Sequence, residues 1–204
     1  MIPKNKKLFS ELLGIMFGDG CLSRTGNKYI IYISGNKDEY IYLNYIKRLF
    51  MDNFDKKVSI NSRVDENTIF IRFSDKNIFN ILKEYLPIGK KYNKLNIPDF
   101  ILDKDKYFFQ FLRGFFDTDG CFVLSKQHKD KPYYPRIEMT SKSKKFLEQN
   151  LLYLKKANFY GSVSFKGNNG FRLEIPGFKN VKLWNDLIGS RNPKNMNKLK
   201  IIKK

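Results

Sequence analysis

The chain has 204 residues, of which 42% are hydrophobic, 16% aromatic and 29% charged. This composition excludes an intrinsically disordered chain and leaves enough apolar material for a hydrophobic core. No apolar run approaches the roughly 20 residues that a membrane-spanning helix needs. The basic N-terminus leads into a segment that holds Glu11 and Asp19. We therefore expect neither a membrane protein nor a secretory signal.

The formal net charge of +19 is the strongest feature of the composition. Lysine and arginine occur in both halves of the chain, so a folded surface must carry them. Such a surface favours a polyanionic partner, and nucleic acid is the most common one. The codon bias of an AT-rich genome is an alternative source of the lysines, but it does not explain why acidic residues are so few.

The chain has two cysteines, Cys21 and Cys121, and a single histidine, His128. The spacing fits neither a zinc site nor a disulfide framework. One histidine excludes a histidine-rich metal site or a catalytic histidine cluster, and we do not expect a Ser-His-Asp triad. We expect both cysteines to be reduced residues that contribute to packing.

Two segments 100 residues apart have similar sequences, LLGIMFGDGC at residues 12–21 and LRGFFDTDGC at residues 112–121. Each predicts an apolar helix with two small residues four positions apart. Small residues at this spacing allow two helices to pack with their main chains close together. The final glycines, Gly20 and Gly120, are expected to be the left-handed residues that end these helices.

The same order of elements follows each repeated segment. Beyond it we expect a strand, a helix, a hairpin and a second helix, with Pro98 in the link between the halves. The sequence thus predicts an α+β fold of two pseudo-symmetric αββαββα halves, residues 1–97 and 98–204, whose strands each have one polar and one apolar face. The predicted strands cover 28–34, 58–63, 68–74, 135–140, 161–166 and 171–175, the helices 42–50, 77–86, 146–157 and 180–188, and a tight turn 167–170.

Asp19 and Asp119 come at the C-terminal ends of the two repeated helices. A helix C-terminus carries partial negative charge, which disfavours a carboxylate there. If the two helices pair, the two acids also approach each other and invite a divalent cation. Hard oxygen ligands with positions left for phosphate and water favour Mg²⁺.

Residues 12–20 and 112–120 resemble the LAGLIDADG signature of the homing endonucleases, in the single-chain form with two motifs. The resemblance extends over the whole chain, because the order of elements after each motif is also similar. It implies that the motif helices join the two halves and that the sheets form a saddle whose polar face lies in the DNA major groove. It also implies metal binding at Asp19 and Asp119, with Gly18 and Thr118 beside them.

The activity implied is Mg²⁺-dependent hydrolysis of both strands of a long, asymmetric double-stranded DNA target, leaving 3′ overhangs, by a monomer without a protein partner. Ca²⁺ or Mn²⁺ are possible substitutes. The alternative is a non-cleaving nucleic-acid binder on the same scaffold, such as an intron-splicing maturase or a regulator. We expect an intron-encoded protein of an organelle, a phage or a prokaryotic cytoplasm.

Several motif positions carry more specific expectations. Lys37 and Lys142 follow matching strands and are candidates either for catalysis at the scissile phosphates or for simple phosphate anchoring. Phe17 stands where the second motif has Asp117, and we interpret Asp117 as a structural group at the helix end. Arg113 replaces a small residue and is expected on the outer helix face.

The remaining candidates are side chains that contact DNA. A hairpin loop at residues 126–132 is a candidate for reaching along the DNA flank, or a solvated charged run, and Trp184 is expected in the core. Each other candidate contacts either a base or a phosphate; these are Lys28, Tyr32, Asn61, Arg63, Arg72, Arg136, Glu138, Lys166 and Arg172.

Overall fold

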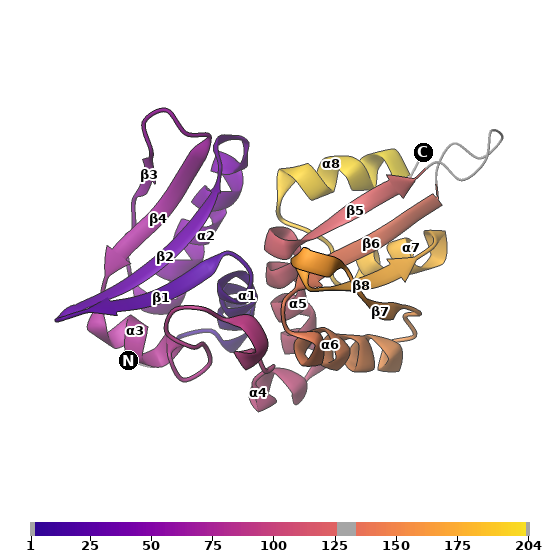
Figure 1. Ribbon diagram of the computed structural model, residues 1–204, viewed down its shortest axis with the longest axis horizontal. Helices are drawn as coiled ribbons and strands as arrows, with labels where there is room; N and C mark the ends of the chain where they lie inside the picture. The colour runs from indigo at the N-terminus through magenta and orange to yellow at the C-terminus, as the bar shows by residue number, and fades with distance from the viewer. Residues whose placement is uncertain (1–2, 126–133, 203–204) are drawn as a thin grey trace.

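A computed structural model describes residues 3–125 and 134–202 of the chain. Two antiparallel four-stranded sheets lie on either side of a central pair of helices, α1 (Lys6–Phe17) and α5 (Asp105–Asp119) (Figure 1). Within the described ranges, none of the helices is long and apolar enough to cross a bilayer. The expected loop at residues 126–132 lies outside the described residues.

The first half contains one sheet in the order β1-β2-β4-β3, with every neighbouring pair antiparallel. After α1 its elements are β1 (Gly20–Thr25), β2 (Lys28–Asn36), the 3-10 turn η1 (Lys37–Glu39), α2 (Tyr40–Phe54), β3 (Ile60–Ser62), β4 (Thr68–Ser74) and α3 (Lys76–Leu82).

The second half repeats this arrangement with the sheet order β5-β6-β8-β7. The repetition confirms the predicted α+β class and the pseudo-symmetric halves. Its elements are η2 (Tyr92–Lys94) and α4 (Asp99–Leu102) in the link, α5, β5 (Gly120–Ser125), β6 (Tyr134–Ser141), α6 (Lys144–Lys156), β7 (Ser162–Phe165), η3 (Gly167–Asn169), β8 (Phe171–Pro176), α7 (Phe178–Leu187) and α8 (Pro193–Ile202).

The halves differ after their last shared helix. Residues 91–95 form only the short turn η2 and the link, whereas residues 195–199 belong to α8, so similar sequences have different structures there. The first hairpin helix, α3, ends at Leu82 rather than at the predicted Leu86. The pseudo-symmetry therefore holds for the motif helices and sheets but not for the segments that connect and close the halves.

Side-chain caps explain where several of these helices begin. The Asn5 carboxamide oxygen accepts hydrogen bonds from the backbone N–H groups of Lys7 (3.0 Å) and Leu8 (3.2 Å) and so starts α1. Asp75 caps α3 in the same way, and Ser143 caps α6. Each cap satisfies backbone donors that have no partner within the helix.

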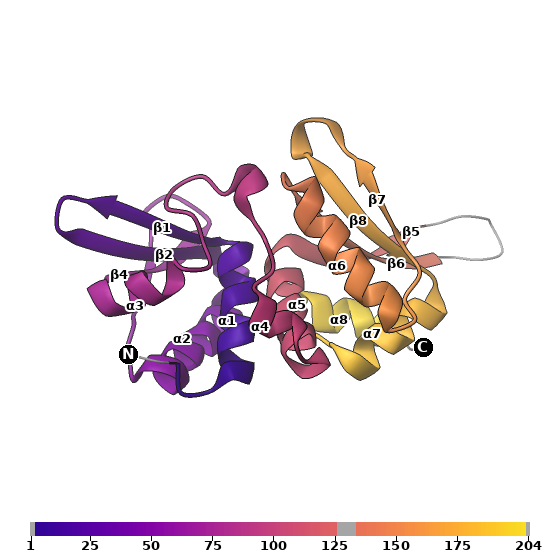
Figure 2. The ribbon, with the colours of Figure 1, turned by 90° about the horizontal axis from the view of Figure 1, so that it is seen from below.

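Strand alternation places the apolar side chains of both sheets against the helices. In the first sheet Ile31, Ile33 and Ile71 are buried, and Ile33 pairs with Ile71 across β2 and β4. In the second sheet Phe122, Ile137 and Leu173 are the buried counterparts, and Trp184 of α7 is fully buried as expected. The opposite, more polar face of each sheet is left uncovered by these helices, as Figure 2 shows from below.

An aromatic cluster fills the seam between the halves. Phe17, which replaces the acid of the second motif, is buried and packs edge-on against Phe111 of α5, with ring centroids 5.1 Å apart. Its ring also lies 5.5 Å from that of Phe146 on α6. An ionised side chain at this position would need a partner that the apolar cluster does not supply. The departure from the motif thus adds core material to the seam.

Arg113 does not lie on the outer helix face, so that expectation was wrong. Its guanidinium faces the α1–α5 seam and binds the fully buried carboxylate of Glu11 through two hydrogen bonds, Nε to Oε1 (2.9 Å) and Nη2 to Oε2 (2.6 Å). Gln110 accepts a further hydrogen bond from Nη2. The physical reason is that Glu11 would otherwise be an unpaired buried charge.

We expect Arg113→Met to lower the free energy of unfolding by about 3–5 kcal/mol, because it leaves the Glu11 carboxylate buried without its partner. Urea denaturation followed by circular dichroism measures this change. The double variant E11M/R113M removes both charges and should recover most of the loss. A single variant as stable as the wild type, or a double variant less stable than R113M, would contradict the pairing.

Candidate active site

The two motif helices touch along their glycines. A Cβ atom added to Gly14 would lie 1.9 Å from the carbonyl oxygen of Phe111, and one added to Gly114 would lie 2.2 Å from that of Glu11. A Cβ on Gly18 would lie 1.9 Å from the Thr118 hydroxyl oxygen. Only a residue without a side chain fits at these crossings, which explains the predicted small-residue spacing.

Gly20 and Gly120 do not adopt the left-handed conformation that was predicted for them. Neither has a positive φ, and Gly120 is extended, with φ −123° and ψ 167°. Instead they begin β1 and β5, because the chain passes directly from helix to strand and folds back on the last helical turn. A Cβ on Gly20 would lie 2.5 Å from Cα of Met16, so this close approach is what requires glycine.

Asp19 and Asp119 meet where the two helices end. A Cβ on Gly18 would lie 3.3 Å from Oδ2 of Asp119, which places that carboxylate beside the residue preceding Asp19. Burial, together with the negative charges of Asp119 and Glu39, raises the pKa of Asp19 to about 7. Burial also raises the pKa of Asp119 to about 6, against the lowering effect of Lys91. The two acids therefore form a desolvated pair of like charges.

Lys91, from the link between the halves, lies beside this pair of acids. Its Nζ donates hydrogen bonds to the carbonyl oxygens at the end of α1, those of Met16 (3.2 Å), Phe17 (2.8 Å) and Gly18. It is also the cation whose charge lowers the pKa values of both Asp19 and Asp119. No sequence signal distinguished it, because it stands in an ordinary basic run whose fold is set by tertiary contacts.

Asp117 is a buried structural group, in line with its interpretation from sequence. Its carboxylate accepts hydrogen bonds from the Ser190 hydroxyl and from the backbone N–H groups of Arg191 (2.6 Å) and Asn192 (3.3 Å). Asn192 in turn donates through Nδ2 to the Asp117 carbonyl (2.9 Å) and to Oε1 of Glu39 (2.8 Å). This network, which sequence reasoning missed, ties the loop before α8 to both halves.

Beside Asp119 a cavity of about 590 Å³ opens between the halves. Asp119 lines it together with Lys91, Tyr92, Ser141 and Lys142. Lys142 lies at the end of β6, and its Nζ is 5.7 Å from the centre of the Tyr92 ring. Of the two candidate lysines, Lys142 therefore shares a cavity with an acid. Lys37 begins η1 after the matching strand β2, is exposed, and does not line this cavity.

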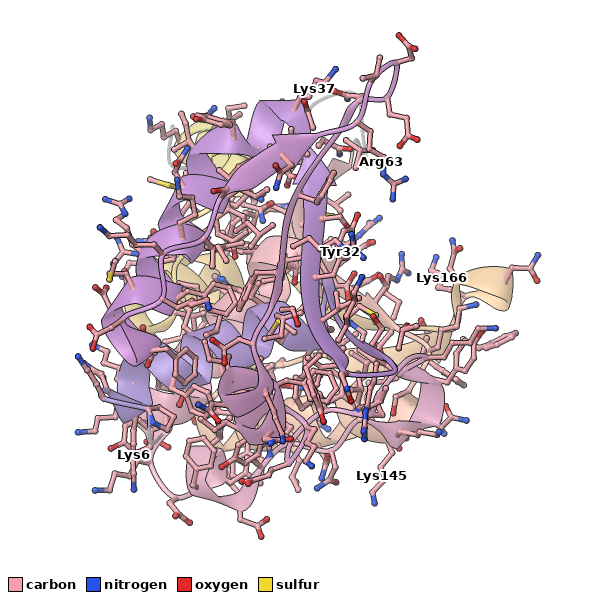
Figure 3. The ribbon with its side chains drawn as sticks, turned by 90° about the vertical axis from the view of Figure 1, so that its left-hand side faces the viewer. Lys6, Tyr32, Lys37, Arg63, Lys145 and Lys166 are labelled. Carbon is pink, nitrogen blue, oxygen red and sulfur yellow. The ribbon has the colours of Figure 1, made fainter. Side chains whose placement is uncertain are left out.

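The DNA-contact candidates of the first sheet follow its polar face. Tyr32 pairs with Arg72 across β2 and β4, and Asn61 pairs with Phe70 across β3 and β4. Arg72, Asn61, Lys28 and Arg63 are exposed. Tyr32, Arg63 and Lys166 point to the same side of the molecule, whereas Lys6 lies on the opposite side (Figure 3). The structure therefore presents candidates from both halves on a common side.

The candidates of the second sheet are bound to one another. Glu138 accepts from Arg136 (2.5 Å) and from Arg172 (2.9 Å), and Glu174 accepts from Arg172 (2.7 Å). Their register places all four on the polar face of β6 and β8. The two arginines thus present guanidinium groups that are already paired. In the first sheet Arg63 likewise pairs with Glu66 (3.2 Å), although it is exposed.

Superposition on known structures identifies the fold. A structure of I-DmoI in complex with DNA and Mn superposes with a TM-score of 0.65 at 18% identity, covering 90% of this chain and 97% of that one. I-WcaI bound to its DNA recognition sequence gives 0.64 at 19% identity, covering 98% and 88%. The chain has the LAGLIDADG homing-endonuclease fold. A family model described as a LAGLIDADG-like domain also matches residues 107–189.

Sequence relatives match this chain within much longer proteins. A probable translation initiation factor IF-2 of Methanocaldococcus jannaschii is 29% identical over 94% of this chain and 16% of its own length. Elongation factor 2 of Methanopyrus kandleri is 28% identical over 98% of this chain and 14% of its own. The chain thus spans about one-sixth or less of the length of these curated relatives.

The raised pKa values of Asp19, Asp117 and Asp119 predict an unusual pH dependence. Burial raises the pKa of Asp117 to about 7 as well. Between the unfolded value of 3.8 and these folded values, the folded state keeps protons that the unfolded state releases. In metal-free buffer their contribution to the free energy of unfolding is therefore present at low pH and lost as the pH rises from about 4 to about 7.

Thermal denaturation in EDTA across this pH range measures the effect. Asp19→Asn combined with Asp119→Asn removes two of the three groups. As the pH rises, the wild type should therefore lose more stability than the double variant. A difference that does not depend on pH would show that these carboxyl groups titrate normally.

Proposed function

We propose that the protein is a site-specific DNA endonuclease that hydrolyses both strands of a long, asymmetric duplex target with a divalent metal ion and leaves 3′ overhangs. The observation that carries this proposal is the convergence of Asp19 and Asp119 at the seam between two sheets whose polar faces are free. The DNA complexes of I-DmoI and I-WcaI, which have the same fold, support it.

The residues at the seam fit a hard divalent cation. Among the described residues no group of three or more His, Cys, Asp or Glu side chains gathers, so the protein's own donors would be the two carboxylates and nearby backbone oxygens. Mg²⁺ is commonly held by one or two carboxylates, with substrate phosphates and water completing its shell. We propose that Asp19 and Asp119 hold the metal, with Gly18 and Thr118 contributing oxygens beside them.

When bound, the metal would orient a water nucleophile and stabilise the charge on the leaving oxygen. The chain's own residues would place the phosphates against it. Lys142 lies in the cavity with Asp119 and is positioned to bind a phosphate there. Lys37 stands at the equivalent strand end of the other half and is proposed for the second strand. Mg²⁺ is the proposed ion, and structures of relatives hold Mn, Mg or Ca.

We propose that the polar faces of the two sheets contact the major groove on either side of the cut. Strands suit this role because a two-stranded ribbon fits the groove and its alternate side chains reach the base edges. The exposed Lys28, Asn61, Arg63 and Arg72 would contact the DNA from one half. The paired Arg136, Glu138 and Arg172 would contact it from the other, with Lys166 at the η3 turn. Because the sheets carry different groups, the target would be asymmetric.

We propose that the chain acts as a mobile genetic module. Its relatives carry the matching segment within longer proteins, of which that segment is 14–16%. An endonuclease-coding segment inserted in frame within another gene accounts for this pattern, whereas a segment within an intron would be removed before translation. The activity of the translation factors is not attributed to the chain, because the match covers so little of them.

A cleavage selection tests the proposed function. Plasmids that carry the DNA sequences flanking and spanning the gene's insertion point, or a randomised insert library, are incubated with the protein in Mg²⁺ and in EDTA. We expect linear DNA with 3′ overhangs in Mg²⁺ only. Tight binding to a specific site without cleavage in Mg²⁺ would instead identify a non-cleaving binder on this scaffold. Neither binding nor cleavage would reject DNA as the partner.

A further inference from the structure

The link between the halves contributes a cation to the seam from outside the repeated elements. Lys91 lies at the start of η2, between α3 and α4, in a stretch that runs between the two halves (Figure 2). The pseudo-symmetric copy of this stretch is part of α8, so the second half has no equivalent link residue. Lys91 therefore comes from a link, whereas Lys194, the cation of the second half that acts on Asp19, comes from α8.

The contacts of Lys91 are those of an ion bound to oxygen ligands. Its ammonium donates to three successive carbonyl groups, those of Met16, Phe17 and Gly18, which have no partner inside α1 because the helix ends there. A cation at this place is stabilised by the partial negative charge of the helix C-terminus. The Gly18 carbonyl is also one of the oxygens proposed above as a metal ligand.

The charges around Lys91 explain why a cation is needed there. Asp19 and Asp119 both act on it electrostatically, and Glu39 adds a third negative charge near Asp19. Lys194 also lowers the pKa of Asp19 from the other half, but no hydrogen bond of Lys194 to either acid is present among the described residues. Lys91 is thus the cation held by direct hydrogen bonds at the helix end that carries the acids.

We propose that Lys91 is a positioning residue that serves as a built-in counter-cation, holding the ends of the two motif helices together before a divalent ion binds and sharing the Gly18 carbonyl with that ion. The part that concerns the metal rests on the proposed function. The part that concerns charge compensation does not. In this arrangement the ends of the two motif helices pack together without metal. When the divalent ion binds, it takes over part of the charge compensation that the ammonium group provides.

The test compares Lys91→Met with the matched control Lys94→Met, which removes the same charge from an exposed position of η2 in the same link. In EDTA we expect K91M to lower the melting temperature by about 5 °C or more, and K94M to change it by about 1 °C at most. Lys91→Arg keeps the charge and should recover part of the loss. Equal melting temperatures for K91M and K94M would overturn the proposal.

Two further measurements separate charge compensation from simple packing. Adding Asp119→Asn to K91M removes one of the excess negative charges and should raise the melting temperature above that of K91M alone. Adding Ca²⁺ to the protein without DNA should stabilise K91M by more degrees than the wild type. A purely structural role predicts that D119N does not rescue K91M and that Ca²⁺ shifts both proteins equally, and either result would overturn the proposal.

These readouts are independent of cleavage. If the wild type cuts no DNA but D119N still rescues K91M in EDTA, the proposed function fails while the counter-cation role stands. If the wild type cuts DNA but K91M behaves like K94M in all three measurements, the endonuclease assignment stands and the role of Lys91 is rejected.

Discussion

Asp19→Asn and Asp119→Asn are each expected to lower the rate of DNA cleavage in Mg²⁺ by about a thousand-fold or more. Both changes remove a carboxylate charge from the pair that is proposed to hold the metal, while the side-chain volume is almost unchanged. Metal-ion stabilisation of a transition state is worth several kcal/mol, and about 4 kcal/mol corresponds to a thousand-fold in rate. Cleavage of a plasmid substrate under single-turnover conditions measures the loss.

The control is Asp103→Asn, which makes the same chemical change at an exposed residue after α4. It should cleave at the wild-type rate. DNA binding by D19N and D119N, measured in Ca²⁺ by a mobility shift, should persist, because the polar sheet faces are untouched. Cleavage by the D19N/D119N double variant at a rate near that of the wild type would reject the metal assignment, whichever binding result accompanied it.

The sequence was sufficient to predict the parts of this molecule that follow from local pattern. Gly14 and Gly114 four residues before a second small residue indicated a close helix pair, and the alternation around Ile31 and Ile137 indicated sheets with one apolar face. Both predictions depend on side chains within one element or its repeated copy. A duplication displays each pattern twice, which is why the fold class could be inferred without a structure.

Other features could not be predicted because they join segments that are distant in the sequence. Arg113 was assigned to solvent since its partner, Glu11, is 102 residues away and on the other helix. Lys91 and Asn192 look like ordinary polar loop residues, and only the tertiary fold brings them to Asp19 and Asp117. The left-handed conformation predicted for Gly20 was wrong for a related reason. Close approach to the preceding turn requires glycine just as a left-handed φ does, and sequence does not separate the two causes.

Asymmetry between the halves has a consequence for how the candidate site works. The repeated elements supply one acid each, but the compensating groups differ. Lys91 comes from the link, and the Glu39–Asn192–Asp117 network comes from the loop before α8. The candidate metal site is thus supported by two segments of the chain that the repeat does not relate. We infer that the two acids are not equivalent, because Glu39 and Lys194 act electrostatically on Asp19, whereas the charge that acts on Asp119 is that of Lys91.

Gly14→Ala and Gly114→Ala are each expected to lower the free energy of unfolding by about 4 kcal/mol or more, which is the range of severe core disruptions. Alanine favours a helix over glycine by about 1 kcal/mol, so intrinsic propensity alone predicts the opposite sign. The added methyl group, however, would lie 1.9 Å from the Phe111 carbonyl in one case and 2.2 Å from the Glu11 carbonyl in the other. The helices would have to separate, which would also open the Glu11–Arg113 pair. Chemical denaturation measures both variants.

The matched control is Lys7→Ala, which adds an alanine to the exposed start of the same helix α1 and should change stability by no more than about 0.5 kcal/mol. The two glycines lie at the seam, away from the polar sheet faces. Variant protein that still folds should therefore bind DNA more weakly only if the two halves change their relative orientation. If G14A or G114A were as stable as the wild type, the main chains of α1 and α5 would not be in contact. The convergence of Asp19 and Asp119, which depends on that contact, would then lose its structural basis.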